Sequence, residues 1–153
     1  MAILLTDPTT PKLADRCQFQ LAGWIDTAPF EDLLGMTIES CGEGEAVLSM
    51  PFEVRFAQGG GVLHGGALTA LADTAVAIAI KTLLPPGTTF ATTSLTTRFL
   101  APVRQGRVRV RAEVSGPQGR SFSGKAVVVD DAEVVVAEFR AEFRVARGQG
   151  FEE

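Results

Sequence analysis

Asp73 is the residue of this chain that is most unusual in its surroundings. It stands within a stretch, 67–80, that is otherwise almost wholly apolar or small. An unpaired carboxylate there is costly, so Asp73 is a candidate for catalysis or ligand binding, or else a carboxylate satisfied by a partner across an interface. The apolar residues predict a helix buried on nearly all sides. Those at helical spacing are Leu68, Leu71, Ala72, Ala75, Val76 and Ala79.

The side of this helix that carries Asp73 has little bulk. One turn back along it lies Thr69, and the same stripe continues to Gly66 and Gly65, because residues three and four apart are neighbours on a helix surface. The sequence therefore predicts a narrow path from the start of the helix to Asp73, which a ligand can enter.

The flanking sequence predicts the elements that must position the helix. Thr10 and Pro11 predict a short N-terminal helix ending near Gly23, and a second short turn is expected over 29–34. Alternating residues predict strands over 36–41 and 45–52 with a hairpin turn between them. The Pro-Pro-Gly sequence at 85–87 ends the helical region, and a period of two follows. The later strands are expected near 94–99, 107–114, 122–128 and 135–145.

Two strands, one long apolar helix and four more strands fit an α+β fold, in which an antiparallel sheet holds a single helix against one face. One curved sheet does not cover a helix that is apolar all round, so its far side is expected to meet the same helix of a second subunit. We therefore expect a homodimer or homotetramer of one domain over 1–153. Within that domain, 1–29 form an N-terminal helical segment and 147–153 a frayed tail.

Composition narrows the class of protein. The formal net charge is −4, and the 14 lysines and arginines form no long run, which argues against nonspecific nucleic-acid binding. Cys17, Cys41 and the single histidine lack metal-ligand spacing, so we expect free thiols and neither a metal nor a redox cofactor. The first residues do not read as a signal peptide, and 67–80 is too short to cross a bilayer. We expect a cytoplasmic protein without membrane contacts.

With these elements in place, the chain resembles the hotdog fold, and specifically the phenylacetic-acid-degradation (PaaI-like) type of acyl-CoA thioesterase. The resemblance covers about Phe30 to Val145 and rests on three motifs, which are His64-Gly65-Gly66, Ala72-Asp73-Thr74 at the spacing of that family, and Phe99-Leu100-Ala101-Pro102. It implies an antiparallel sheet wrapped around one long central helix. It also implies hydrolysis of an acyl- or aryl-CoA thioester to the free acid and coenzyme A.

The resemblance implies roles for individual residues as well. Asp73 would act as general base or nucleophile, and the backbone N–H of Gly65 would polarise the thioester carbonyl. His64 would support the loop and contact the thioester region, or serve only as a helix cap. Gln58 stands where the family usually has Asn, an amide that helps to orient the carboxylate or the water. Thr92 offers a hydroxyl for that water, although a threonine also simply suits a strand.

Elementary chemistry supports the two main roles. Thioester hydrolysis needs a base or nucleophile on one side of the carbonyl carbon and a donor for the oxyanion on the other. Gly65 and Gly66 would open the helix, where unpaired N–H groups and the positive end of the dipole favour developing negative charge. Gly66 and Thr69 would also line the path of the substrate.

The spacing of these groups bears on the oligomeric state. Gly65 and Asp73 are eight residues apart, roughly 12 Å along one helix, and cannot serve one carbonyl from the same chain. Two antiparallel helices across a twofold axis bring Asp73 of one subunit to Gly65 of the other. We therefore expect active sites shared across the dimer interface, and inactive monomers.

Two alternatives stay open at this point. A hotdog hydratase or dehydratase would use His64 and Asp73 as a proton-transfer pair, whereas glycines directly after the histidine favour an oxyanion and hydrolysis. A noncatalytic acyl-CoA-binding module is the other alternative. The sequence leaves open the acyl group and the choice between dimer and tetramer.

Overall fold

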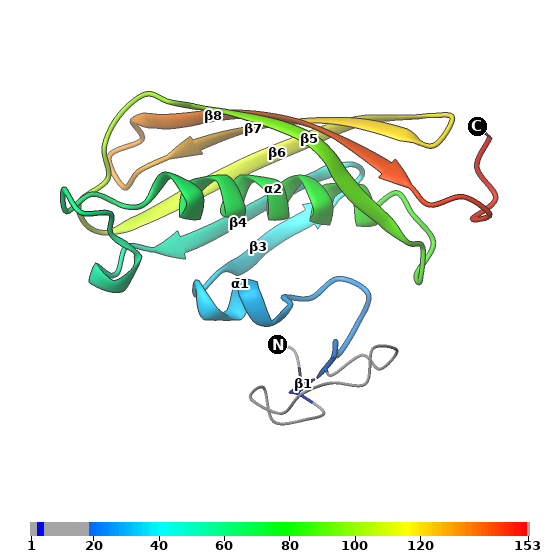
Figure 1. The fold of residues 1–153 in the computed structure, drawn as a ribbon, viewed down its shortest axis with the longest axis horizontal. Helices are drawn as coiled ribbons and strands as arrows, with labels where there is room; N and C mark the ends of the chain where they lie inside the picture. Colours follow the sequence, from blue (N-terminus) through cyan, green and yellow to red (C-terminus); the bar gives the residue numbers. More distant parts are fainter. Residues whose placement is uncertain (1–2, 5–18, 153) are drawn as a thin grey trace.

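The computed structural model describes residues 3–4 and 19–152, and in this part of the chain one helix lies across one face of a six-stranded antiparallel sheet (Figure 1). The helix is α2, Gly65–Lys81, and the order of strands across the sheet is β3-β4-β6-β7-β8-β5. This arrangement confirms the predicted order of two strands, one helix and four strands. The strands are β3 Thr37–Gly42, β4 Glu45–Pro51, β5 Phe90–Phe99, β6 Arg107–Gln118, β7 Ser121–Val129 and β8 Val135–Val145.

The N-terminal region differs from the sequence prediction. Strand β2, Phe19–Gln20, pairs with β1, Ile3–Leu4. The prediction of a helix that runs to Gly23 is therefore wrong at its C-terminal end. Strand pairing overrides local helix propensity there. The rest of that predicted helix, and Cys17, lie outside the described residues. The short helix α1, Pro29–Leu33, is present, and Gly35 follows it at a φ of 70°, the left-handed conformation that commonly ends a helix.

The core lies between α2 and the inner face of the sheet. Alternate residues of β6, β7 and β8 are buried, as a strand with one face toward a core requires. The helix is buried along most of its circumference, whereas Ala70, Asp73 and Ala77 are half-buried and Gly66 is exposed. In the described single chain, one stripe of α2 is therefore only partly covered.

Strand β5 carries a β-bulge that decides which of its side chains face the helix. The register with β8 shifts between Thr92 and Ser94, and a bulge changes which side of the strand later residues occupy. Thr92 lies opposite the buried Phe143 and faces α2, and beyond the bulge Thr97 and Phe99 lie opposite buried residues of β8 and face the same way. The bulge thus places Thr92 and Phe99, seven residues apart, on one face.

The segment before α1 is fastened to the C-terminal end of α2. The indole Nε1–H of Trp24 donates to the carbonyl of Lys81, and Lys81 Nζ donates to the carbonyl of Trp24, both at 3.0 Å. The ammonium also lies 4.8 Å from the centroid of the Trp24 ring, within the range of a cation–π contact.

Among the described residues, no helix is long and apolar enough to cross a membrane.

Candidate active site

The carboxylate of Asp73 projects from the middle of α2 toward the edge strand β5. Thr92 Oγ1 donates a hydrogen bond to Asp73 Oδ1 at 2.8 Å, because Thr92 lies opposite the buried Phe143 and faces α2. This bond holds the plane of the carboxylate and leaves Oδ2 available to accept a proton. The hydroxyl oxygen of Thr92 keeps lone pairs for a second hydrogen bond, such as one from a water.

Two effects act in opposite directions on the acidity of Asp73. Burial raises the pKa of the carboxyl above its ordinary value, and the hydrogen bond from Thr92 acts to lower it. The effect of burial is the larger, as expected when a charged group loses part of its hydration. A carboxylate with a raised pKa is a stronger base than an ordinary aspartate, which suits proton abstraction near neutral pH.

The start of α2 is built around His64 and two glycines. His64 is the N-cap, and its Nδ1 accepts a hydrogen bond from the N–H of Gly66 at 2.8 Å. In the neutral ring the proton is therefore on Nε2. The capping role expected as one possibility for His64 is thus present in the structure, and it occupies the Gly66 N–H.

The N–H of Gly65 is different, because it has no hydrogen-bond acceptor among the described residues. It is one of the first N–H groups of the helix, which have no intrahelical partner and lie at the positive end of the dipole. An added Cβ on Gly65 would lie 2.9 Å from Cζ of Phe99. The ring of Phe99 therefore fills the side of Gly65 that any other residue type would occupy.

A cavity of about 430 Å³ opens beside this glycine. It lies between the loop that precedes α2 and the segment that follows β5, and most of its lining is apolar. Gly65 and Gln58 both line it, which brings two of the predicted site residues to one cavity. The apolar lining includes Val62, Leu63, Leu68, Phe99, Leu100 and Val103.

Gln58 and Thr69 are engaged in local contacts. The Gln58 side-chain oxygen accepts a hydrogen bond from the N–H of Gly60 and so closes its own turn. The hydroxyls of Thr69 and Thr97 are hydrogen-bonded, with 2.8 Å between the oxygens, and this bond ties α2 to β5. Within the chain, the structure therefore places Gln58 near Gly65, and it places Thr69 between the two ends of the candidate site.

With this geometry established, comparison with known proteins becomes informative. The profile of the thioesterase superfamily matches residues 60–137, a stretch that contains Gly65, Asp73 and Thr92. The chain belongs to the thioesterase superfamily. The expectation of a hydrolase is thereby confirmed at the level of the family, and the family match agrees with the hotdog arrangement of sheet and helix.

Two relatives carry the name "Putative esterase". The protein from Haemophilus influenzae is 39% identical over 79 residues, which cover 52% of this chain and 57% of the relative, so the chain spans little more than half of that protein. The one from Halobacterium salinarum is 30% identical over 145 residues, 88% of this chain and 95% of the relative. Among solved structures, the E. coli PaaI protein from the phenylacetic acid degradation operon is 28% identical, with a TM-score of 0.72 over 80% of this chain and 87% of that chain.

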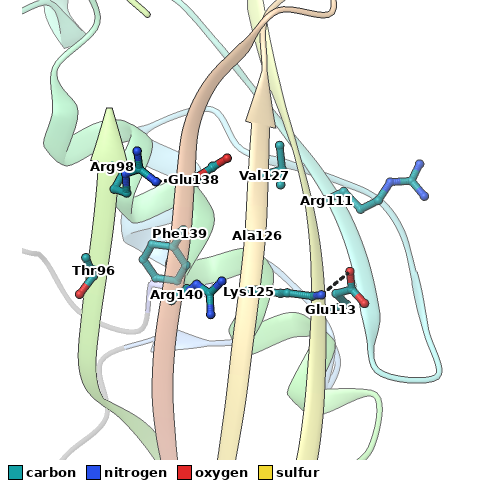
Figure 2. Close-up of a pocket in the computed structure, with 10 residues that line it drawn as sticks. All are labelled: Thr96, Arg98, Arg111, Glu113, Lys125, Ala126, Val127, Glu138, Phe139 and Arg140. Carbon is teal, nitrogen blue, oxygen red and sulfur yellow. Dashed lines mark hydrogen bonds and ion pairs between the residues drawn. The ribbon is translucent and has the colours of Figure 1, made fainter. Parts of the chain in front are cut away.

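A second hollow, of about 340 Å³, lies on the outer face of the sheet, away from the helix (Figure 2). Charged side chains surround Val127 there, and they pair with one another across strands. Arg98 contacts Glu138 at 3.5 Å and Lys125 contacts Glu113 at 3.6 Å. Because this hollow contains neither Asp73 nor an open helix terminus, we do not place the thioester chemistry of the superfamily in it.

Phe99 is the residue of the site whose position sequence reasoning did not foresee. Its motif is part of the resemblance, yet its contact with Gly65 depends on the bulge in β5, and no periodicity in the sequence indicates that bulge.

Among the residues described, no three His, Cys, Asp or Glu side chains gather as a metal-binding group.

Proposed function

We propose that this member of the thioesterase superfamily is an acyl-CoA thioesterase, which hydrolyses an acyl- or aryl-CoA thioester to the free acid and coenzyme A. One observation carries the proposal. A single helix presents a half-buried carboxylate with a raised pKa, Asp73, and an unpaired N–H at its N-terminus, Gly65. These are the two groups that thioester hydrolysis requires.

In the simplest mechanism, Asp73 acts as a general base. Its carboxylate takes a proton from a water, and the water oxygen bonds to the carbonyl carbon while the carbonyl electron pair moves to oxygen. The N–H of Gly65 donates a hydrogen bond to that oxyanion. When the intermediate collapses, the carbon–sulfur bond breaks, the thiolate of coenzyme A leaves, and the proton held by Asp73 returns to the products. In the alternative, the Asp73 carboxylate itself attacks the carbonyl carbon, the carbon–sulfur bond breaks with release of the coenzyme A thiolate, and water hydrolyses the resulting anhydride.

Each complete site draws on two subunits in this proposal. Gly65 and Asp73 lie roughly 12 Å apart along α2, so one carbonyl does not reach both in one chain. The partly covered stripe of α2 runs from Gly66 through Asp73 to Ala77, and Leu95 of the neighbouring edge strand is 43% exposed on the same side. An antiparallel copy of α2 against this stripe covers it and completes two equivalent sites.

The remaining predicted residues have supporting roles in this proposal. Thr92 orients Asp73 and accepts a hydrogen bond from the attacking water. His64 fixes the first turn of α2 and directs its Nε2–H outward from the cap. Gln58, Gly66 and Thr69 border the path of the substrate. The reaction needs neither metal nor cofactor, and the cytoplasmic location stays a prediction from the sequence.

The geometry weighs against the two alternatives. A hydratase would use His64 and Asp73 of opposite subunits as a proton-transfer pair, but the Nδ1 of His64 already accepts the N–H of Gly66 as the helix cap, which gives the imidazole a structural role at the helix start. A module that only bound acyl-CoA would have no need for a desolvated carboxylate held by a hydroxyl, since such a group costs stability.

The deciding experiment measures release of free thiol from a panel of acyl-CoA and aryl-CoA thioesters, with Asp73→Asn as the control. Catalytic release by the wild type that is lost in the variant supports the proposal. Binding of acyl-CoA without release identifies a binding module. Loss of the enoyl absorbance of a 2-enoyl-CoA without thiol release identifies a hydratase.

A further inference from the structure

The cavity beside Gly65 has fixed backbone walls. The N–H of Leu63 donates to the carbonyl of Val103 at 2.7 Å, and this bond joins the two segments that enclose the cavity. The N–H of Leu100 donates to the carbonyl of Val136 at 2.8 Å and anchors the wall that follows β5. Since the backbone is held on both sides, the shape of the cavity depends on side chains rather than on loop movement.

Those side chains divide into a buried floor and an exposed rim. Leu63, Leu68 and Val103 are at most 4% exposed and form the floor. Phe99 and Leu100 are 55% and 47% exposed at the rim. An exposed ring beside a hollow loses little on rotation about χ1, and it gains from any apolar group that covers it.

The ring of Phe99 also lies against Gly65, whose N–H has no acceptor in the part of the chain that the structure describes. Because a Cβ on Gly65 would be 2.9 Å from the tip of the ring, the ring packs against the glycine at the point where the helix begins. A group attached to a carbonyl that accepts a hydrogen bond from Gly65 must therefore pass beside the ring.

We infer that this cavity is the pocket for the acyl group, that it takes an apolar alkyl or aryl group, and that Phe99 determines which such groups fit. This inference rests on the function proposed above. The lining favours the acyl group over the pantetheine arm, since that arm carries two amides that need partners when buried. Gln58, which lines the cavity, already uses its side-chain oxygen on the N–H of Gly60.

The first test is a profile of kcat/KM over butanoyl-, octanoyl-, dodecanoyl- and phenylacetyl-CoA for the wild type and for Phe99→Ala, Phe99→Leu and Phe99→Trp. Removing the ring lengthens the pocket, so Phe99→Ala should raise the ratio for dodecanoyl-CoA over butanoyl-CoA by about tenfold or more, since even one methylene changes discrimination by 10-fold or more. Phe99→Leu should fall between the two, and Phe99→Trp should shift the profile the opposite way.

Val127→Ala is the matched control. Val127 is an apolar residue, 42% exposed, in the hollow on the outer face of the sheet (Figure 2), and its truncation should leave the profile unchanged. Since the Phe99 ring is more than half exposed, Phe99→Ala should fold, and a thermal melt verifies this. An unchanged profile in a folded, active Phe99→Ala enzyme overturns the inference and leaves the proposed function standing. A wild type without thioesterase activity overturns both.

The second test measures whether the ring and Gly65 act together. We expect Gly65→Ala to displace the ring and lower kcat/KM, and to cost about tenfold less in a Phe99→Ala background, where the clash is absent. If instead the two losses multiply independently, the ring does not govern the approach to Gly65, and the inference fails.

Discussion

The two ends of the proposed site, both on α2, differ in almost every physical respect. At the start of the helix the functional group is a backbone N–H, set beside an apolar cavity and bordered by a ring that is half exposed. Two turns later it is a side-chain carboxylate, partly desolvated and held by a hydroxyl from β5. In the proposed mechanism, one end stabilises negative charge and the other accepts a proton.

Because the two ends do different chemistry in this proposal, neither is sufficient for hydrolysis without the other. An oxyanion donor without a base stabilises an intermediate that does not form, and a base without a donor generates a nucleophile whose product is not stabilised. The helix that carries both also keeps them roughly 12 Å apart. The separation is a property of α-helix geometry, and in the proposed dimer a second copy of the helix closes it.

The largest effect is expected at the carboxylate end. Asp73→Asn or Asp73→Ala should lower kcat by about 100-fold or more, because a base or nucleophile is removed. Steady-state kinetics on the most active thioester of the panel measures this loss. The circular dichroism spectrum should not change, because the residue is not part of the core. Equal turnover in wild type and variant would contradict the catalytic role of Asp73.

The same substitution should make the fold more stable at neutral pH. Burial raises the pKa of Asp73 in the folded protein, so folding favours the neutral acid, and its contribution to stability is full below the unfolded pKa and is lost as pH rises through the folded pKa. Asp73→Asn has no carboxyl group to ionise, so it does not lose stability as the pH rises. Its Tm should exceed that of the wild type at pH 7, and the difference should be absent below about pH 4, near the unfolded pKa of aspartate.

Sequence reasoning predicted the carboxylate end better than the glycine end, for a physical reason. A charged residue in an apolar helix is visible in the periodicity alone, and so are the strands that cover the helix. The bulge near Thr93 is a property of pairing between β5 and β8, and a single strand does not record its register. The contact of Phe99 with Gly65 follows from that register and was therefore not predictable.

Other local outcomes also depended on tertiary contacts. The Gln58 side-chain oxygen accepts a hydrogen bond from the N–H of Gly60 in its own turn, a local contact that the sequence did not indicate. The strands expected near 107–114 and 122–128 are longer in the structure, where β6 continues to Gln118 and β7 begins at Ser121. The family and the fold were predictable because they depend on the spacing of a few motifs and on hydrophobic alternation.

The next effect is expected at the glycine end. Gly65→Ala keeps the backbone N–H but places a methyl group against the Phe99 ring, which should crowd the carbonyl and misalign its donor. We expect kcat/KM to fall by about 100-fold, near the value of one oxyanion donor, roughly 3 kcal/mol. Mixing this chain with Asp73→Asn should restore activity, because each heterodimer then holds one site with both native groups. Independent sites give about half of the wild-type activity per heterodimer. Verified heterodimers as inactive as the parent variants would refute the shared site.

A smaller effect at the carboxylate end tests how much the orientation of Asp73 by Thr92 contributes to activity. Thr92→Val keeps the shape of the side chain and removes the hydrogen bond to Asp73, which should lower kcat by about tenfold, as for a lost hydrogen bond to a charged group. Because that bond acts to lower the pKa of Asp73, the acidic limb of the kcat/KM profile should move to higher pH. Thr93→Val, the neighbouring exposed threonine, is the control. An acidic limb at the wild-type position would show that Thr92 is only a strand residue.

The smallest effect is expected at the helix cap and tests how far the glycine end depends on His64. His64→Ala removes the acceptor of the Gly66 N–H and should lower the free energy of unfolding by about 1 kcal/mol, the usual cost of losing an N-cap. His64→Asn supplies another N-cap acceptor and should restore that stability, which thermal and urea unfolding measure. If both variants turn over substrate at the wild-type rate, the imidazole only caps the helix. If His64→Asn is stable yet slower in kcat, the free Nε2–H acts on the thioester, and the glycine end then contains a side-chain donor as well as the backbone N–H.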